Sequence, residues 1–280
     1  MTRAFLTAAL CAVQAACSPL VGALNLLVPK SGYSAHRDIA YGTDTRQRLD
    51  IYVPEGLKQS APVVLFFYGG SWDSGTKKDY LAFGEAMASK GIIAVVADYR
   101  VSPEVKYPAF IEDGARAFRF VHDKIAAYGG DPKRLFLAGH SAGAYIAVML
   151  ASNLSYLKAQ SLDADAIAGV IGIAGPYDFL PLTDPKLVEI FGGAHNTAML
   201  PITYVNGARP PMLLVTGSDD GTVGPGNTSR MAAKLRLHNS PVREIVYPGT
   251  GHIGIILSLV PGFRGRTSLR DDMVRFIAEY

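Results

Sequence analysis

The sequence predicts an α/β fold in which a mostly parallel β-sheet is covered by helices on both faces. The 280 residues are 49% hydrophobic, which is enough for a full-sized core and too apolar for a disordered chain. Short apolar segments alternate with longer segments of helical periodicity, a pattern typical of strand–helix–strand units. Because no repeat or low-complexity linker interrupts this alternation, we expect one folded domain.

The expected strands become more apolar after the first. Residues Gln47–Val53 alternate polar and apolar side chains as a half-exposed strand does, whereas Pro62–Tyr68 is nearly all apolar, as in a strand covered on both faces. Further apolar runs lie at Ile92–Asp98, Arg134–Gly139, Gly169–Ala174, Met212–Thr216 and Val242–Tyr247. Helical patterns lie at Tyr80–Ser89, Pro108–Tyr128, Ala142–Ser152, Pro225–His238 and Ser268–Ala278. Chemistry in such sheets gathers at the carboxyl ends of the strands.

The amino terminus is expected to direct export. No side chain from Ala4 to Pro29 is charged, Arg3 gives a short positive start, and Ala4–Ala16 is apolar over the length of a signal peptide. We expect residues 1–17 to be a signal peptide, 18–35 a linker or membrane-proximal segment, and 36–280 the folded domain. The protein would then be periplasmic or attached to the membrane.

Cys17 is a candidate lipidation site. Ala15-Ala16-Cys17 resembles the end of a bacterial lipoprotein signal, in which cleavage before the cysteine frees that residue for lipid attachment. An ordinary cleaved signal or an uncleaved anchor would give the same apolar stretch.

Composition excludes several kinds of site. Lys plus Arg (27) exceeds Asp plus Glu (24) only slightly and no dense basic stripe is present, so nucleic-acid binding is not expected. Both cysteines, Cys11 and Cys17, precede the expected domain, which leaves it without a thiolate zinc site or a cysteine nucleophile. No two histidines have the i, i+4 spacing of a helical metal site. We expect no metal and no organic cofactor.

The candidate nucleophile is Ser141. Gly139-His140-Ser141-Ala142-Gly143 has the G-x-S-x-G pattern and lies between an expected strand and an expected helix. Glycines two positions before and after the serine allow a turn too tight for side chains. The helix that follows points backbone N–H groups at a developing anion.

A serine hydroxyl needs a base, and the base needs a carboxylate to orient it. His252 follows the last expected strand in a glycine-rich turn, and Asp219 and Asp220 follow the strand before it. The carboxyl ends of these strands lie at the same sheet edge as Ser141. Either aspartate could serve as the carboxylate.

The chain resembles an α/β-hydrolase of the carboxylesterase type, including feruloyl-esterase-like, kynurenine-formamidase-like and hormone-sensitive-lipase-like enzymes. Tyr68-Gly69-Gly70-Ser71-Trp72 resembles their H-G-G-G-W oxyanion loop, with Tyr68 in place of histidine. The resemblance implies an eight-stranded sheet and selects Asp220 by its G-x-x-D-x-x-V spacing. It also implies an oxyanion hole made by the N–H groups of Gly70, Ser71 and Ala142.

The substrate pocket is expected near the oxyanion loop. Its candidate residues are Trp72, His140, which either lines the pocket or supports the turn, and Tyr177. Residues 179–210 either cover the pocket or pack as ordinary helix and loop. The resulting hypothesis is a serine carboxylesterase acting on a small-molecule ester. The alternatives are an amide hydrolase with the same triad and a catalytically silent binding protein.

Overall fold

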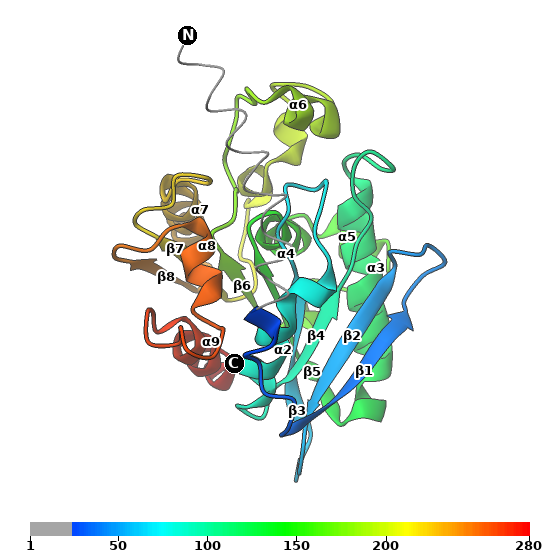
Figure 1. The fold of residues 1–280 in the computed structure, drawn as a ribbon. Coiled ribbons are helices and arrows are strands. Elements are labelled where there is room, and N and C mark those ends of the chain that lie inside the picture. Colours follow the sequence, from blue (N-terminus) through cyan, green and yellow to red (C-terminus); the bar gives the residue numbers. More distant parts are fainter. Residues whose placement is uncertain (1–23) are drawn as a thin grey trace.

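The computed structural model describes residues 24–280 (Figure 1). Cys17 and the expected signal peptide at residues 1–17 lie outside this range. Among the described residues, no helix has the length and apolar character required to cross a membrane.

One eight-stranded sheet runs through the molecule in the order β1-β2-β4-β3-β5-β6-β7-β8. The first two strands of this order are antiparallel to their neighbours, and all pairs from β4–β3 to β7–β8 are parallel. The expected α/β fold with an eight-stranded, mostly parallel sheet is confirmed. The strands are β1 Tyr33–Ala40, β2 Arg48–Pro54, β3 Ala61–Phe67, β4 Ile93–Ala97, β5 Gly130–His140, β6 Gly169–Ile173, β7 Met212–Gly217 and β8 Val242–Tyr247.

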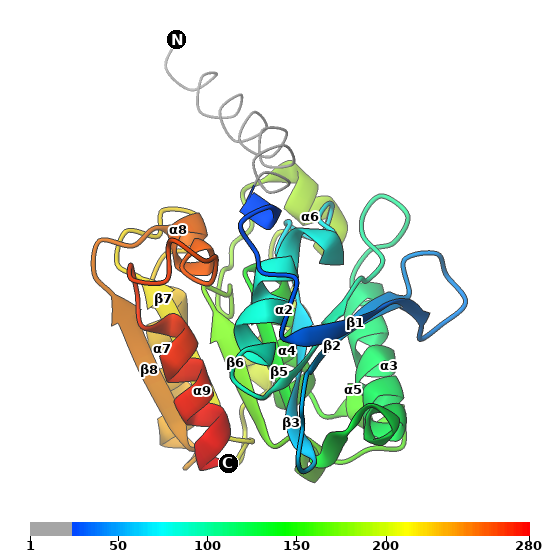
Figure 2. The same ribbon diagram turned by 60° about the horizontal axis from the view of Figure 1, so that its bottom comes forward.

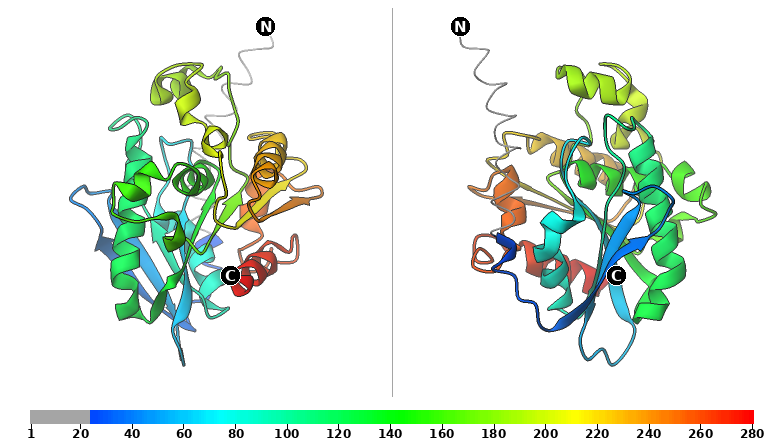
Figure 3. Two further views of the ribbon diagram at one scale, coloured as in Figure 1. Left: turned by 180° about the vertical axis from the view of Figure 1, so that it is seen from behind. Right: turned by 45° about the vertical axis from the view of Figure 1, so that its right-hand side comes forward.

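Helices cover both faces of the sheet. Helices α3 and α4 contact each other on one face, and α2 contacts α9 on the other (Figure 3). Helices α6 and α8 lie at the end where the parallel strands terminate (Figure 2). The α-helices are α2 Leu81–Ala88, α3 Ala109–Lys124, α4 Ala142–Ser152, α5 Ser155–Lys158, α6 Pro185–Phe191, α7 Gly226–Leu237, α8 His252–Leu257 and α9 Leu269–Glu279.

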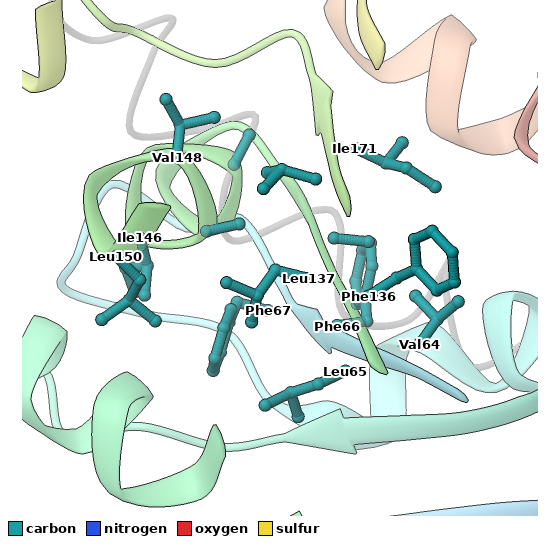
Figure 4. Close-up of a cluster of buried hydrophobic side chains, with 14 of the residues drawn as sticks. Val64, Leu65, Phe66, Phe67, Phe136, Leu137, Ile146, Val148, Leu150 and Ile171 are labelled. Carbon is teal, nitrogen blue, oxygen red and sulfur yellow. The ribbon is translucent and has the colours of Figure 1, made fainter. Parts of the chain in front are cut away.

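The core lies where β3 and β5 meet α4. Every residue of α4 is buried, and the side chains of the two strands pack against it and against each other (Figure 4). Fully burying one large apolar side chain stabilises the fold by about 1.5–3 kcal/mol. This dense packing fixes the turn between β5 and α4, where Ser141 lies.

The folded domain starts earlier than the expected residue 36. Strand β1 begins at Tyr33, and Val28 is buried against Ala82 and Val260. The sequence pattern predicts no strand at Tyr33–Ala40: most of its side chains are polar or small and two, Arg37 and Asp38, are charged, so it lacks an apolar pattern.

Candidate active site

Ser141 occupies a sharp turn between β5 and α4. Its backbone has φ 55° and ψ −121°, a conformation that non-glycine residues rarely adopt. Such strain persists only where the surroundings hold it. Here the Ser141 N–H donates to the Ile173 carbonyl of β6 at 2.9 Å, and α4 begins at the next residue.

The two glycines of the motif are required by close backbone contact. A Cβ atom on Gly139 would lie 2.2 Å from the backbone of Gly143, and one on Gly143 would lie 2.0 Å from the carbonyl oxygen of Phe67. Side chains at either position would force β5, α4 and β3 apart.

The structure brings Ser141, His252 and Asp220 into one hydrogen-bonded line. His252 Nε2 lies 2.9 Å from Ser141 Oγ, and His252 Nδ1 lies 2.8 Å from Asp220 Oδ2. The Asp220 side chain is fully buried, and that of His252 is 9% exposed. The three residues follow β5, β7 and β8, whose carboxyl ends lie at one edge of the sheet.

Asp220 is held in its ionised form. Burial alone would raise its pKa, but the hydrogen bond with His252 and the N–H donors of Val223 and Thr222 outweigh burial and lower the pKa below its usual value. Asp219 is exposed and accepts a hydrogen bond from the Ser218 hydroxyl at 2.6 Å. Of the two candidates, only Asp220 contacts His252.

The expected oxyanion loop, which we take as residues 68–75, has an unusual backbone. Gly70, Ser71 and Trp72 have φ angles of 140°, 50° and 60°. The carbonyl of Gly70 accepts from the N–H groups of Asp73 (3.0 Å) and Ser74 (3.1 Å), which closes the loop on itself.

Three backbone donors remain available at this loop and turn. Within the described residues, the N–H groups of Gly70, Ser71 and Ala142 donate to no protein acceptor. The amides of a strained loop and of a helix N-terminus are suited to bind a developing negative charge.

His140 and Tyr177, both expected near the pocket, occupy packing positions. Tyr177 is fully buried, and a Cβ atom on Gly172 or Gly175 would lie within 2.5 Å of its hydroxyl oxygen. His140 is 2% exposed and supports the turn, because its Nε2 lies 3.1 Å from the carbonyl oxygen of His252. Burial and the neighbouring His252 lower the pKa of His140 to about 3.

Trp72 is also buried, within a cluster of aromatic rings. Its ring centroid lies 5.1 Å from that of Tyr145 and 4.8 Å from that of Phe191, and its ring plane is stacked on Phe179 at 6.1 Å. Within the described residues, its buried indole N–H has no hydrogen-bond acceptor.

Residues 179–210 pack over this aromatic cluster. Phe179 and Phe191 of this segment contribute rings to it, and the Tyr145 hydroxyl donates to the Met199 carbonyl at 2.7 Å. Lys186 of α6 forms an ion pair with Asp73 of the oxyanion loop. The segment therefore contacts the loop directly, above the carboxyl ends of the strands (Figure 1).

Tyr80 is a residue of this site that sequence reasoning missed. Its hydroxyl accepts from the Gly69 N–H at 3.2 Å and lies 3.4 Å from His140 Nδ1. Tyr80 therefore joins the oxyanion loop to the residue preceding Ser141. Nothing in the local pattern around position 80 indicates this contact.

No group of three or more His, Cys, Asp or Glu side chains within residues 24–280 is arranged to hold a metal ion. The arrangement of hydroxyl, imidazole, carboxylate and backbone donors is instead suited to nucleophilic attack on a carbonyl carbon.

The strand order and the Ser-His-Asp line define a protein of the α/β-hydrolase class. Among solved structures, a truncated carbohydrate esterase from gut microbiota is similar with a TM-score of 0.78 and 20% identity, covering 90% of this chain and 98% of that one. Esterase B from Lactobacillus rhamnosis has the same TM-score at 18% identity and covers 97% and 96%.

A family model described as BD-FAE matches residues 49–235, and the chain belongs to the BD-FAE family. Isoprenylcysteine alpha-carbonyl methylesterase ICME from Arabidopsis thaliana is 30% identical, over 86% of this chain and 61% of its own. Esterase LipC from Mycobacterium tuberculosis is 27% identical, over 84% and 62%. The chain thus spans about three fifths of the length of these curated relatives.

Proposed function

We propose that the protein is a serine carboxylesterase that works through an acyl-enzyme. Ser141 Oγ attacks the ester carbonyl while its proton passes to His252 Nε2, and Asp220 stabilises the imidazolium through Nδ1–H. The N–H groups of Gly70, Ser71 and Ala142 stabilise the oxyanion. His252 returns the proton to the leaving alcohol, and water then hydrolyses the acyl-enzyme by the same steps.

The observation that carries this proposal is the hydrogen-bonded line from Ser141 through His252 to Asp220, with distances of 2.9 and 2.8 Å. Within these distances the proton can move from the hydroxyl to the imidazole without any rearrangement of the chain. The names of the relatives, a methylesterase and an esterase, support an ester as the substrate.

The test is hydrolysis of a p-nitrophenyl ester series by the wild-type chain, Ser141→Ala and Ser155→Ala. Ser155 is exposed and lies in α5, so its variant controls for the loss of a hydroxyl elsewhere. We expect activity in the wild type and Ser155→Ala and its loss in Ser141→Ala. Inactivity of the wild type on every ester would instead favour a silent binding protein with this fold.

An amide hydrolase using the same residues is the second candidate, because the geometry suits any acyl transfer to water. A formanilide in the substrate series separates the two. Faster turnover of the formanilide than of every ester would replace esterase with formamidase.

We also propose that the chain is exported and attached to a membrane through its amino terminus. The uncharged residues 4–29 support this, as do Leu26 and Leu27, which are 79% and 54% exposed at the start of the described chain.

Two measurements test export and attachment. Fatty-acid labelling of the wild type and Cys17→Ala tests lipidation. Equal incorporation of the label into both proteins would reject lipidation of Cys17. Cell fractionation of the wild type, Leu26→Ser and Leu237→Ser tests attachment, since Leu237 is 74% exposed at the end of α7 and serves as the control. A wild-type chain found in the soluble cytosolic fraction would contradict the proposal.

A further inference from the structure

The oxyanion loop must be held in place from outside, because its own backbone is strained. Ser71 and Trp72 both have positive φ angles, a conformation that is unfavourable for residues with a side chain. Without external support the chain would relax and turn these amides away from the position of the oxyanion.

Arg46 contacts both ends of this loop. Its Nη2 donates to the hydroxyl of Tyr68 at 2.8 Å and to the backbone carbonyl of Gly75 at 2.8 Å. Its Nε donates to the Tyr99 carbonyl at 2.9 Å, which fixes the guanidinium relative to the segment after β4. One planar group therefore ties the entry of the loop to its exit.

The surroundings make this contact rigid. Tyr68 is fully buried, its ring stacks on that of Tyr99 at 4.7 Å, and its carbonyl accepts from the Tyr99 hydroxyl at 2.8 Å. A Cβ atom on Gly75 would lie 2.7 Å from the Tyr68 ring and from the Gly69 carbonyl. Gly75 at the end of the loop thus packs directly on Tyr68 at its start, and Arg46 hydrogen-bonds to both residues.

We infer that Arg46 is a positioning residue for the oxyanion hole, acting through Tyr68 and Gly75 on the amides of Gly70 and Ser71. This inference rests on the proposed esterase function. The fork of the guanidinium matters, since a lysine ammonium is a single point donor that cannot reproduce the contacts of Nε and Nη2 together.

Loss of Arg46 should affect the transition state more than the bound substrate. The oxyanion amides bind strongly only where negative charge develops, so a displaced loop lowers kcat and leaves KM nearly unchanged. A misplacement of about 1 Å can cost about 100-fold in rate. We expect kcat to fall about 10- to 100-fold in Arg46→Lys.

The experiment compares Arg46→Lys, Arg46→Ala and Tyr68→Phe with Arg209→Lys. Arg209 is a matched control because it also donates to backbone carbonyls, those of Ser152 (3.0 Å) and Ala208 (2.9 Å), but it precedes the amino-terminal end of β7. For each variant, kcat, KM, Tm and the affinity for a boronic acid are measured, since the boronate adduct mimics the tetrahedral oxyanion. Added guanidinium at low concentration should partly restore kcat in Arg46→Ala only.

The inference is supported if kcat and boronate affinity fall together in the Arg46 variants while KM stays within about twofold and Arg209→Lys behaves as the wild type. It is overturned if Arg46→Lys keeps the wild-type kcat, or if KM alone changes. If the Arg46 variants do not fold, Tyr68→Phe decides: it removes the hydroxyl that accepts from Arg46 and that also bonds to Asp98, and a wild-type kcat in this variant overturns the inference. A wild type inactive on all esters refutes the proposed function instead.

Discussion

His140 Nε2 donates a hydrogen bond to the backbone carbonyl of His252 across 3.1 Å. The residue before the candidate nucleophile thus supports the residue proposed as its base. With Nε2 protonated, Nδ1 is an acceptor, and it lies 3.4 Å from the Tyr80 hydroxyl, which in turn accepts from the Gly69 N–H. A neutral imidazole therefore links α8, η1 (Lys77–Tyr80) and the oxyanion loop.

This buried neutral histidine should make the fold sensitive to acid. The pKa of His140 is about 3 in the folded protein against 6.5 in the unfolded chain, so below pH 6.5 the unfolded state binds a proton that the folded state does not. Stability is full above pH 6.5 and falls as the pH drops towards 3. Between pH 6.5 and 4.5 the wild type should lose about 1–3 kcal/mol more than His140→Gln, which keeps the donor without titrating. Urea unfolding at several pH values measures this, and equal losses in both proteins would contradict it.

The two adjacent aspartates should differ in their effect on catalysis. Asp220→Asn removes the charge that stabilises the imidazolium, so kcat should fall about 10³- to 10⁴-fold. Asp219→Asn changes an exposed carboxylate with no contact to His252 and should keep the wild-type rate. Steady-state kinetics on one p-nitrophenyl ester compares them, and a larger loss in Asp219→Asn would reassign the carboxylate.

The sharp turn at Ser141 should tolerate no side chain at Gly143. A methyl group there would lie 2.0 Å from the carbonyl oxygen of Phe67, so Gly143→Ala should destabilise the fold by at least about 3 kcal/mol. Gly265→Ala is the control, because no atom lies within 4 Å of its added Cβ. Thermal unfolding followed by circular dichroism compares the two, and similar Tm values would show that β3 and α4 can separate at little cost.

Phe179 should influence which acyl or alcohol group is accepted. Its ring stacks at 6.1 Å on that of Trp72, the residue that follows the proposed oxyanion donor Ser71. Phe179→Ala therefore opens space beside the loop. We expect the ratio of kcat/KM for p-nitrophenyl octanoate to kcat/KM for p-nitrophenyl acetate to rise at least about threefold. Phe263→Ala, which removes a half-buried ring from the separate cluster around Val260, should leave the ratio unchanged. An unchanged ratio in both variants would place substrate binding elsewhere.

Much of the sheet and the positions of the triad residues could be predicted because they follow from local patterns. Buried strands are apolar throughout, and the glycine spacing around Ser141 is a local motif, although Gly143 also lies against the distant Phe67 carbonyl. The residues alone leave the choice between Asp219 and Asp220 open, because it depends on side-chain direction within a loop. The G-x-x-D-x-x-V spacing of the resembled family selects Asp220, and this is the aspartate that contacts His252 in the structure.

Other features arise from contacts between distant segments. Arg46 reaches the Tyr99 carbonyl across 53 positions, and His140 reaches the His252 carbonyl across 112. Backbone carbonyls carry no sequence signature, so the partners of these side chains appear only in the folded chain. Strand β1 was not expected for a different reason, since an exposed edge strand needs no apolar face.

The segment between β6 and β7 carries none of the groups proposed to react, since Ser141, Asp220 and His252 follow β5, β7 and β8. An insert of another length or composition between residues 179 and 210 would therefore leave these three side chains in place, but it would have to restore the packing of Phe179 on Trp72 and the ion pair between Lys186 and Asp73. Such exchange offers protein engineers a route to new substrate ranges, and it would let evolution diversify esterases from a single scaffold.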